Sequence, residues 1–108
     1  MNNETDVNAL QPPIEIDRVI HEPARLLILA YLFVVESADF LFIMNQTGLT
    51  RGNLSSHLSK LEAAGYVEIT KKFEKKIPRT LLQLTKAGQK AFREYRQNMK
   101  QVLGSLPD

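Results

Sequence analysis

The stretch TGLTRGNLSSHLSKLEAAGYVEI, residues 47–69, decides the fold of this chain. Thr50 is a residue type that caps the N-terminus of a helix, because its hydroxyl can accept a hydrogen bond from the first turn. Gly65 provides a stop, since glycine readily takes the left-handed conformation found just after helices. The apolar residues between these signals recur at helical spacing and mark one buried stripe: Leu54, Leu58 and Leu61. We therefore predict a helix over residues 51–64.

Two further helices are predicted upstream of this stretch. Asp39 can cap a short helix from Phe40 to Thr47, which Gly48 would end in a left-handed conformation. Before it, Pro23 suits the first turn of a helix that runs to about Val34. The apolar run inside that helix is only about half as long as the roughly 20 residues that a bilayer span requires. It is therefore expected to be a core helix, and no membrane contact is expected.

A hairpin and a last helix are predicted downstream. Residues 66–73 and 79–84 are rich enough in β-branched and aromatic side chains to form two strands, joined by a polar turn at 74–77. Thr85 can cap a final helix that extends to about Leu103. The order of three helices, a hairpin and a helix is typical of a winged helix-turn-helix. The expected fold class is mostly α with a two-stranded β-hairpin wing, a three-helix core and a C-terminal dimerisation helix.

The length of 108 residues allows one ordinary core. We expect a flexible N-terminal arm over residues 1–13 and a single winged-helix DNA-binding domain over 14–108, with the dimerisation helix at about 85–106. The first residues, MNNETDVNALQPP, have neither the basic nor the apolar stretch of a secretory signal, which favours a cytoplasmic location. The absence of cysteine removes disulfides and thiolate chemistry.

Charge is distributed unevenly along the chain. Residues 1–50 hold two bases against seven acids, whereas residues 51–100 hold twelve bases against four acids. A polyanion would be attracted to the second half. Double-stranded DNA is therefore the predicted partner.

The helix over 51–64 carries the features of a recognition helix. Small residues lie opposite its leucine stripe, so the helix could enter a major groove, where Arg51 could read guanine and Asn53 adenine. A merely solvated face is the alternative, but such faces are usually richer in Glu and Lys. The predicted DNA contacts of this helix are Thr50, Arg51, Gly52, Asn53, Ser55, Ser56, Ser59 and Lys60.

The hairpin is strongly basic near its tip. A basic wing can hold phosphates beside the groove, although a lysine-rich strand edge can also serve only solubility. The predicted DNA contacts of the wing are Lys71, Lys72, Lys75, Lys76, Arg79 and Thr80.

Apolar residues of the last helix are spaced three and four apart, as in the seam of a short coiled coil. Two heptads associate weakly alone, so we expect help from the apolar N-terminal segment, whose apolar residues sit at helical spacing. A monomer that folds this seam onto its own core is the alternative. The predicted homodimer interface contains Ile16, Val19, Ile20, Phe92, Tyr95, Met99, Val102 and Leu106.

Enzyme chemistry is not predicted, and neither a catalytic residue nor a cofactor is assigned. His57 and Ser55 are two apart on a helix and point to different sides, so they cannot form a nucleophile and base pair. The five glycines form no known phosphate-binding loop. With two histidines and no cysteine, no metal site is predicted, although a carboxylate-assisted site between protomers stays open. His57 is interpreted as a packing residue at the boundary of the core.

The run over residues 47–69, followed by PRTLLQLTKAGQKAF at 78–92, resembles winged-helix transcriptional regulators of the broad MarR and ArsR kind, especially small stand-alone members. The similarity covers roughly residues 17–96. Its most specific parts are residues 47–67 and the pattern at Arg79, Thr80, Leu84, Thr85 and Gly88. The resemblance implies that the helix at 51–64 enters the major groove, that the hairpin is the wing, and that the outer helices form a homodimer. The cysteine and histidine clusters of ArsR-type metal sensors and the acid-arginine wing tip of MarR-like proteins do not occur here.

The sequence leaves three functions open. The favoured one is a homodimer that binds a pseudo-palindromic site and regulates transcription. A winged-helix module that binds another protein, or an architectural protein that binds DNA without sequence preference, would share the same fold. A small-molecule effector stays unknown.

Overall fold

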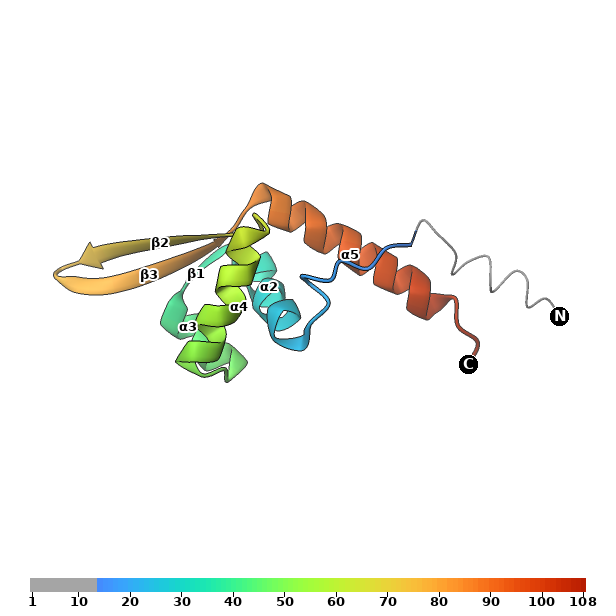
Figure 1. Cartoon of the computed structure of the whole chain (residues 1–108), viewed down its shortest axis with the longest axis horizontal. Helices are drawn as coiled ribbons and strands as arrows, with labels where there is room; N and C mark the ends of the chain where they lie inside the picture. Colours follow the sequence, from blue (N-terminus) through green and yellow to red (C-terminus); the bar gives the residue numbers. More distant parts are fainter. Residues whose placement is uncertain (1–13) are drawn as a thin grey trace.

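The computed structural model of the chain describes residues 14–108 (Figure 1). The arm predicted at residues 1–13 lies outside the described residues. The elements, in chain order, are helix α2 (Pro23–Val35), strand β1 (Ser37–Asp39), helix α3 (Phe40–Thr47), helix α4 (Arg51–Ala63), strands β2 (Val67–Glu74) and β3 (Ile77–Leu84), and helix α5 (Lys86–Gly104). The predicted order of helices and hairpin is confirmed.

The helix-turn-helix begins and ends at the residues that the sequence indicates. The Asp39 side chain accepts a hydrogen bond from the backbone N–H of Leu41 and caps α3. Gly48 ends α3 with φ of 74°, in the left-handed region where glycine is favoured. The Thr50 hydroxyl then accepts from Asn53 N–H at 3.1 Å and starts α4. The turn between the two helices is therefore fixed locally.

The sheet has three antiparallel strands in the order β1-β3-β2, one strand more than predicted. Glu36 leaves α2 with φ of 70°, and its carbonyl accepts a hydrogen bond from Leu84 N–H at 3.0 Å. This places Asp39 beside Leu81 in the ladder. A strand of three residues is too short to show an alternating pattern, so only its partner strand reveals it.

The wing is the part of the hairpin that projects beyond β1, as Figure 1 shows on the left. The turn is tighter than the predicted 74–77, because Glu74 and Ile77 still pair and only Lys75 and Lys76 form the loop. Both lysines have positive φ, 53° and 68°. Two-residue loops of this kind suit the twist of the strands but usually carry Asn and Gly.

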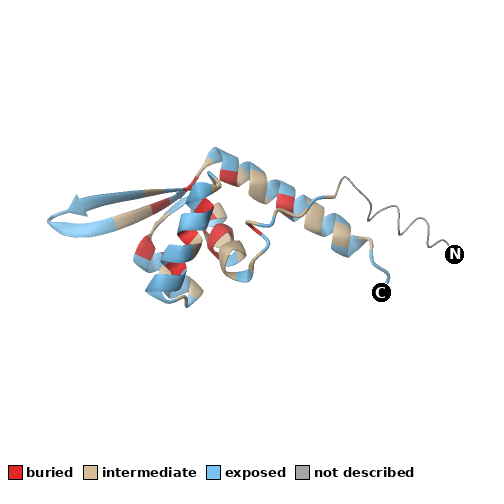
Figure 2. Ribbon diagram, in the orientation of Figure 1, coloured by how far each residue is buried: buried red, intermediate tan, exposed pale blue. Residues whose placement is uncertain are grey.

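The core lies where α2, α3 and α4 meet the base of the sheet (Figure 2). The predicted leucine stripe of α4 is buried, as expected. The fully buried side chains come from five segments of the chain: Ile20, Ile28, Leu29, Leu32, Ile43, Leu54, Leu58, Leu61 and Leu82.

The segment before α2 forms a turn, although its apolar residues sit at helical spacing. The Asp17 side chain accepts hydrogen bonds from the backbone N–H groups of Val19 and Ile20, at 2.9 and 3.1 Å. These side-chain bonds replace the backbone bonds that a helix would use. Pro23 then starts α2 in a new direction.

Helix α5 begins against the base of the wing and extends away from the three-helix body toward the C-terminus (Figure 1). The Thr85 hydroxyl accepts from Gly88 N–H at 2.9 Å, which confirms the predicted cap. Within residues 14–108, every helix is too short or too polar to cross a membrane.

Candidate nucleic-acid interface

An open groove of about 630 Å³ runs between α4 and the wing. We call it the helix–wing groove. Its lining brings together five of the predicted DNA contacts, three from α4 and two from the hairpin. The groove is lined by Phe40, Arg51, Ser55, Leu58, Ser59, Glu62, Ile69, Lys71 and Thr80. Phe40, Glu62 and Ile69 are lining residues that sequence reasoning missed.

Arg51 is held at the mouth of this groove by an aromatic ring. Its guanidinium carbon stands 5.3 Å from the centre of the Phe40 ring, within the range of a cation–π contact. Phe40 itself is buried at the start of α3. The contact leaves the N–H donors at the edge of the guanidinium plane available, and these donors are the ones that read guanine.

The other predicted residues of α4 lie along its exposed surface. Gly52, Asn53 and Ser56 are exposed on the first two turns. Thr50 is exposed too, but its hydroxyl already serves as the helix cap. Lys60 lines a separate hollow beside Arg18 and Arg25. The helix therefore presents a polar surface wider than the groove alone.

The register of the hairpin divides the predicted wing residues between two faces. Lys71 pairs with Thr80, on the same face as the Ile69–Leu82 pair that reaches the core. Lys72 pairs with Arg79 on the opposite face. Only the first pair lines the helix–wing groove.

Arg79 is already paired within the protein. Its guanidinium lies 3.2 Å from the Asp39 carboxylate and 3.4 Å from the Glu74 carboxylate. These partners join β3 to β1 on one side and to β2 on the other. Arg79 thus braces the base of the wing, a role that the sequence did not indicate because Asp39 is 40 residues away.

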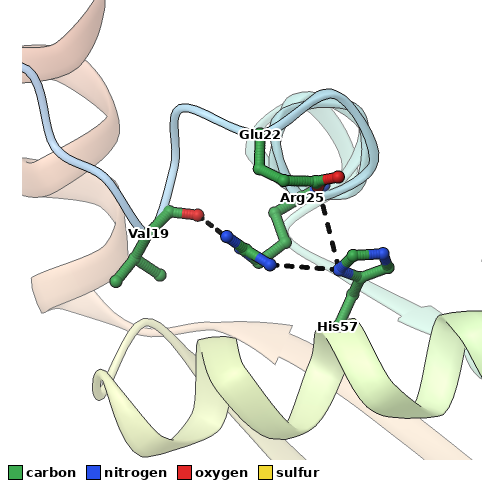
Figure 3. A network of polar contacts seen from close by, with 4 residues as sticks. All are labelled: Val19, Glu22, Arg25 and His57. Carbon is green, nitrogen blue, oxygen red and sulfur yellow. Dashed lines mark hydrogen bonds and ion pairs between the residues drawn. The ribbon is translucent and has the colours of Figure 1, made fainter.

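His57 takes part in a polar network rather than in apolar packing (Figure 3). The Arg25 guanidinium donates to Val19 O at 2.5 Å and to His57 Nδ1 at 3.2 Å. The Glu22 carboxylate accepts from Arg25 N–H at 2.8 Å and lies 3.7 Å from His57 Nδ1. The hydrogen bond from Arg25 N–H lowers the pKa of Glu22, and the positive charge of Arg25 acts in the same direction. The network ties the inner flank of α4 to the start of α2.

Two residues predicted at the dimer interface are buried inside the protomer. Ile20 is fully buried and Tyr95 is only 6% exposed. The Tyr95 hydroxyl is 2.8 Å from His21 Nδ1, and burial raises the pKa of Tyr95. The segment before α2 therefore covers Ile20 and most of Tyr95, although Tyr95 still lines an open apolar groove along α5. The assignment of Ile20 to an intermolecular contact is corrected, and that of Tyr95 stays a prediction.

The rest of the predicted seam is more accessible. Ile16, Val19, Phe92, Met99 and Val102 are half-buried, and Leu106 is exposed. An open apolar groove of about 620 Å³ runs along α5 beside α2, and we call it the α5 groove. Its lining includes Leu26, Phe92, Met99 and Leu103, of which Leu103 is 61% exposed.

Hydrogen bonds fix the N-terminal segment against α5 and the sheet. Tyr66 donates its hydroxyl hydrogen to the Asp17 carboxylate at 2.5 Å, and the Asn98 side chain donates to Glu15 O at 2.8 Å. Burial, followed by the Asp17 carboxylate, raises the pKa of Tyr66 to about 12. In residues 14–108, groups of three or more side chains suited to a metal ion are absent.

Comparison with known proteins agrees with this geometry. A family model described as a winged helix DNA-binding domain matches residues 24–103. An uncharacterized protein of Methanocaldococcus jannaschii is 36% identical over 78 residues, which cover 72% of this chain and 85% of that protein. A transcriptional regulator homologue from Pyrococcus horikoshii has a similar structure, with a TM-score of 0.80 and 27% identity over 96% of this chain and 99% of that one. The PcaV transcriptional regulator of Streptomyces coelicolor shares the fold, with a TM-score of 0.66 and 19% identity over 95% of this chain and 74% of that one.

The fold and the helix–wing groove define a winged helix-turn-helix protein. The chain belongs to the winged helix DNA-binding domain family. This agrees with the predicted resemblance to winged-helix regulators and with the prediction of a DNA-binding protein rather than an enzyme.

Proposed function

We propose that this protein is a homodimer that recognises a specific double-stranded DNA sequence and regulates transcription. Helix α4 lies in the major groove, with Arg51 reading guanine and Asn53 reading adenine. The observation that carries this proposal is the helix–wing groove, in which Arg51 and Lys71 face the same open space. A duplex seated there would contact both elements at once.

The wing supplies phosphate contacts in this proposal. Lys71 lines the groove, while Lys75 and Lys76 form the tip of the hairpin. Each lysine that neutralises a phosphate releases a counterion, so binding weakens as salt rises. Arg79 contributes mainly by bracing the strands, because two carboxylates already hold it.

The homodimer forms through the accessible part of α5. The α5 groove exposes apolar side chains that would remain in contact with water in a monomer. A symmetric pairing of two such helices buries these side chains and sets two copies of α4 on successive major-groove turns, about 34 Å apart. The interface we propose consists of Phe92, Met99, Val102, Leu103 and Leu106, with Ile16 and Val19 at its edge.

The first experiment selects binding sites from a random duplex library with the purified full chain at about 0.05 and 0.15 M salt. A two-fold symmetric motif supports the proposal. Retention of DNA without a motif would favour an architectural protein. Failure to retain DNA at either salt would contradict the proposal and favour a protein-binding module.

The selected site then tests the residues. Arg51→Ala is expected to lose roughly 1–3 kcal/mol of binding free energy and to relax the preference at one base pair. Lys90→Ala is the matched control, because Lys90 is an exposed base on α5, away from the helix–wing groove. Equal effects of the two variants would remove the assigned role of Arg51.

Sedimentation equilibrium tests the dimer. Leu103→Asp combined with Leu106→Asp should yield monomers, since carboxylates would be buried at the proposed interface. Val34→Asp is the control, because Val34 is an exposed apolar side chain on α2 that is not part of this interface. A dimer that survives the double substitution would place the interface elsewhere.

A further inference from the structure

Phe73 presents an aromatic ring to solvent near the tip of the wing. It is 77% exposed, against 43% for Phe42, the other exposed phenylalanine among residues 14–108. It lies two residues before the Lys75–Lys76 loop and pairs with Pro78 across the hairpin. The fold of one protomer gives this ring little to pack on.

The register places Phe73 on the face of the hairpin that serves the helix–wing groove. Alternate residues of a strand share a face, and Phe73 follows Ile69 and Lys71 at steps of two. At about 3.3 Å per residue, its ring lies roughly 13 Å farther out than Ile69. A major groove is about 12 Å wide, so the ring would reach past the groove that holds α4 to the next phosphate ridge and the minor groove beyond it.

The charges around Phe73 indicate the kind of partner. Residues 71–79 contain five bases and one acid, and that acid, Glu74, is occupied by Arg79. Lys71 is on the same face as Phe73, and the loop lysines follow directly. An exposed aromatic ring surrounded by lysines suits a polyanionic partner that also has flat apolar surfaces. Stacked bases between two rows of phosphates have this combination.

We propose that Phe73 is a wedge that enters the minor groove and partly unstacks one base step beside the sequence read by α4. This rests on the proposed function of the protein as a DNA-binding regulator. Apolar side chains inserted in this way kink the duplex, and pyrimidine–purine steps yield most easily. The wing therefore adds specificity for a deformable TA or CA step without a hydrogen bond to a base.

The test measures unstacking directly. The selected duplex is prepared with a TA step or a stiff AA step at the wing position, and with 2-aminopurine next to that step. The wild-type protein should raise the 2-aminopurine fluorescence on the TA duplex and bind it more tightly than the AA duplex. Phe73→Ala should abolish the fluorescence rise and weaken binding to the TA duplex about tenfold, the loss expected for one stacked base.

Val34→Ala is the matched control for Phe73→Ala. Val34 is also exposed, at 80%, but it lies on α2, away from the hairpin and the helix–wing groove. It should bind and unstack the TA duplex as the wild type does. The slope of affinity against salt should be the same for both variants, because neither removes a charge. Phe73→Leu, which keeps an apolar wedge, should retain part of the signal.

Three outcomes would overturn the wedge. In the first, Phe73→Ala binds the TA duplex within about twofold of the wild type. In the second, it loses affinity while the wild type gives no fluorescence rise, which would make Phe73 a surface contact only. In the third, the wild type binds no duplex, which overturns the proposed function as well. If Arg51→Ala weakens DNA binding but Phe73→Ala binds as the wild type does, the proposed function stands and only the proposed role of Phe73 is overturned.

Discussion

Gly88 sits where α5 begins against the strand that leads into the wing, and we expect Gly88→Ala to destabilise the protein. A Cβ atom at Gly88 would lie 2.2 Å from the carbonyl oxygen of Tyr66 and 2.8 Å from Leu84 Cδ1. The leucine methyl can move aside, but the Tyr66 carbonyl is backbone and also accepts a hydrogen bond from Thr85 N–H at 3.0 Å. An ordinary C···O contact is about 3.3 Å or longer. The start of α5 would therefore have to shift by about 1 Å.

The expected loss of stability combines three effects, one that stabilises the variant and two that destabilise it. Alanine is favoured over glycine inside a helix by about 1 kcal/mol, which opposes the loss. Overpacking typically costs about 1–3 kcal/mol, and a clash with backbone falls at the upper end. Weakening the hydrogen bond from Thr85 adds about 1 kcal/mol. The net expectation is a loss of about 2–3 kcal/mol in the free energy of unfolding, or roughly 10–20 °C in Tm for a domain of this size.

Thermal unfolding followed by circular dichroism measures this change. Both proteins are compared at one protomer concentration, because a dimer would make Tm depend on concentration. Gly104→Ala is the matched control, since a Cβ there meets no atom of residues 14–108 within 4 Å. If Gly88→Ala proves as stable as Gly104→Ala, then α5 does not approach Tyr66 as closely as the structure indicates, and the reasoning is refuted.

Two further predictions concern the turn of the wing and a tyrosine. Replacing the loop by Lys75→Asn with Lys76→Gly should raise the free energy of unfolding by roughly 1–2 kcal/mol, because non-glycine residues at positive φ are strained, and should weaken DNA binding because two charges are lost. Urea unfolding and salt-dependent binding check this, and an unchanged unfolding free energy would argue against strain. The raised pKa of Tyr66, about 12 against an ordinary 10, stabilises the fold fully below pH 10, and this contribution is lost as pH rises through 12. Tyr66→Phe should remove that alkaline component in unfolding experiments between about pH 9 and 12, whereas Tyr31→Phe should keep it.

The elements that the sequence predicts well are those whose signals lie within a few residues. Asp39, Thr50 and Thr85 each accept a hydrogen bond from a backbone N–H two or three residues later, so the start of a helix is specified locally. Gly48 ends α3 for an equally local reason. The helix-turn-helix and the start of α5 could therefore be predicted without knowledge of the tertiary structure.

The features that the sequence does not predict depend on partners far along the chain. Strand β1 exists because residues 37–39 meet β3 more than 40 residues later. Arg79 pairs with Asp39, and the Arg51 guanidinium lies over the Phe40 ring across the turn. Pairings of this kind follow from how the elements pack, which local propensity does not specify.

The apolar seam of α5 illustrates the same limit within one helix. Its spacing correctly predicts one apolar stripe, but spacing alone cannot tell which part of the stripe the protomer itself covers. The segment before α2, pinned by Tyr66 and Asn98, covers Tyr95 and leaves the stretch from Met99 to Leu106 more accessible. A dimer test must therefore use the distal residues, because a charge at Tyr95 would unfold the protomer before it reported on association.

The wing shows how the core decides which charge faces the helix–wing groove. Lys71 and Lys72 are adjacent and chemically identical, so composition predicts the same role for both. The pairs Val67–Leu84 and Ile69–Leu82 anchor one face of the hairpin in or against the core, and the period of two then sends Lys71 and Phe73 to the side of α4 and Lys72 to the other side. A slip of one residue would exchange these faces, but it would also expose Val67 and Leu82 to water. Burial of these pairs at the base of the hairpin thus determines which wing side chains lie on the same side of the protein as α4.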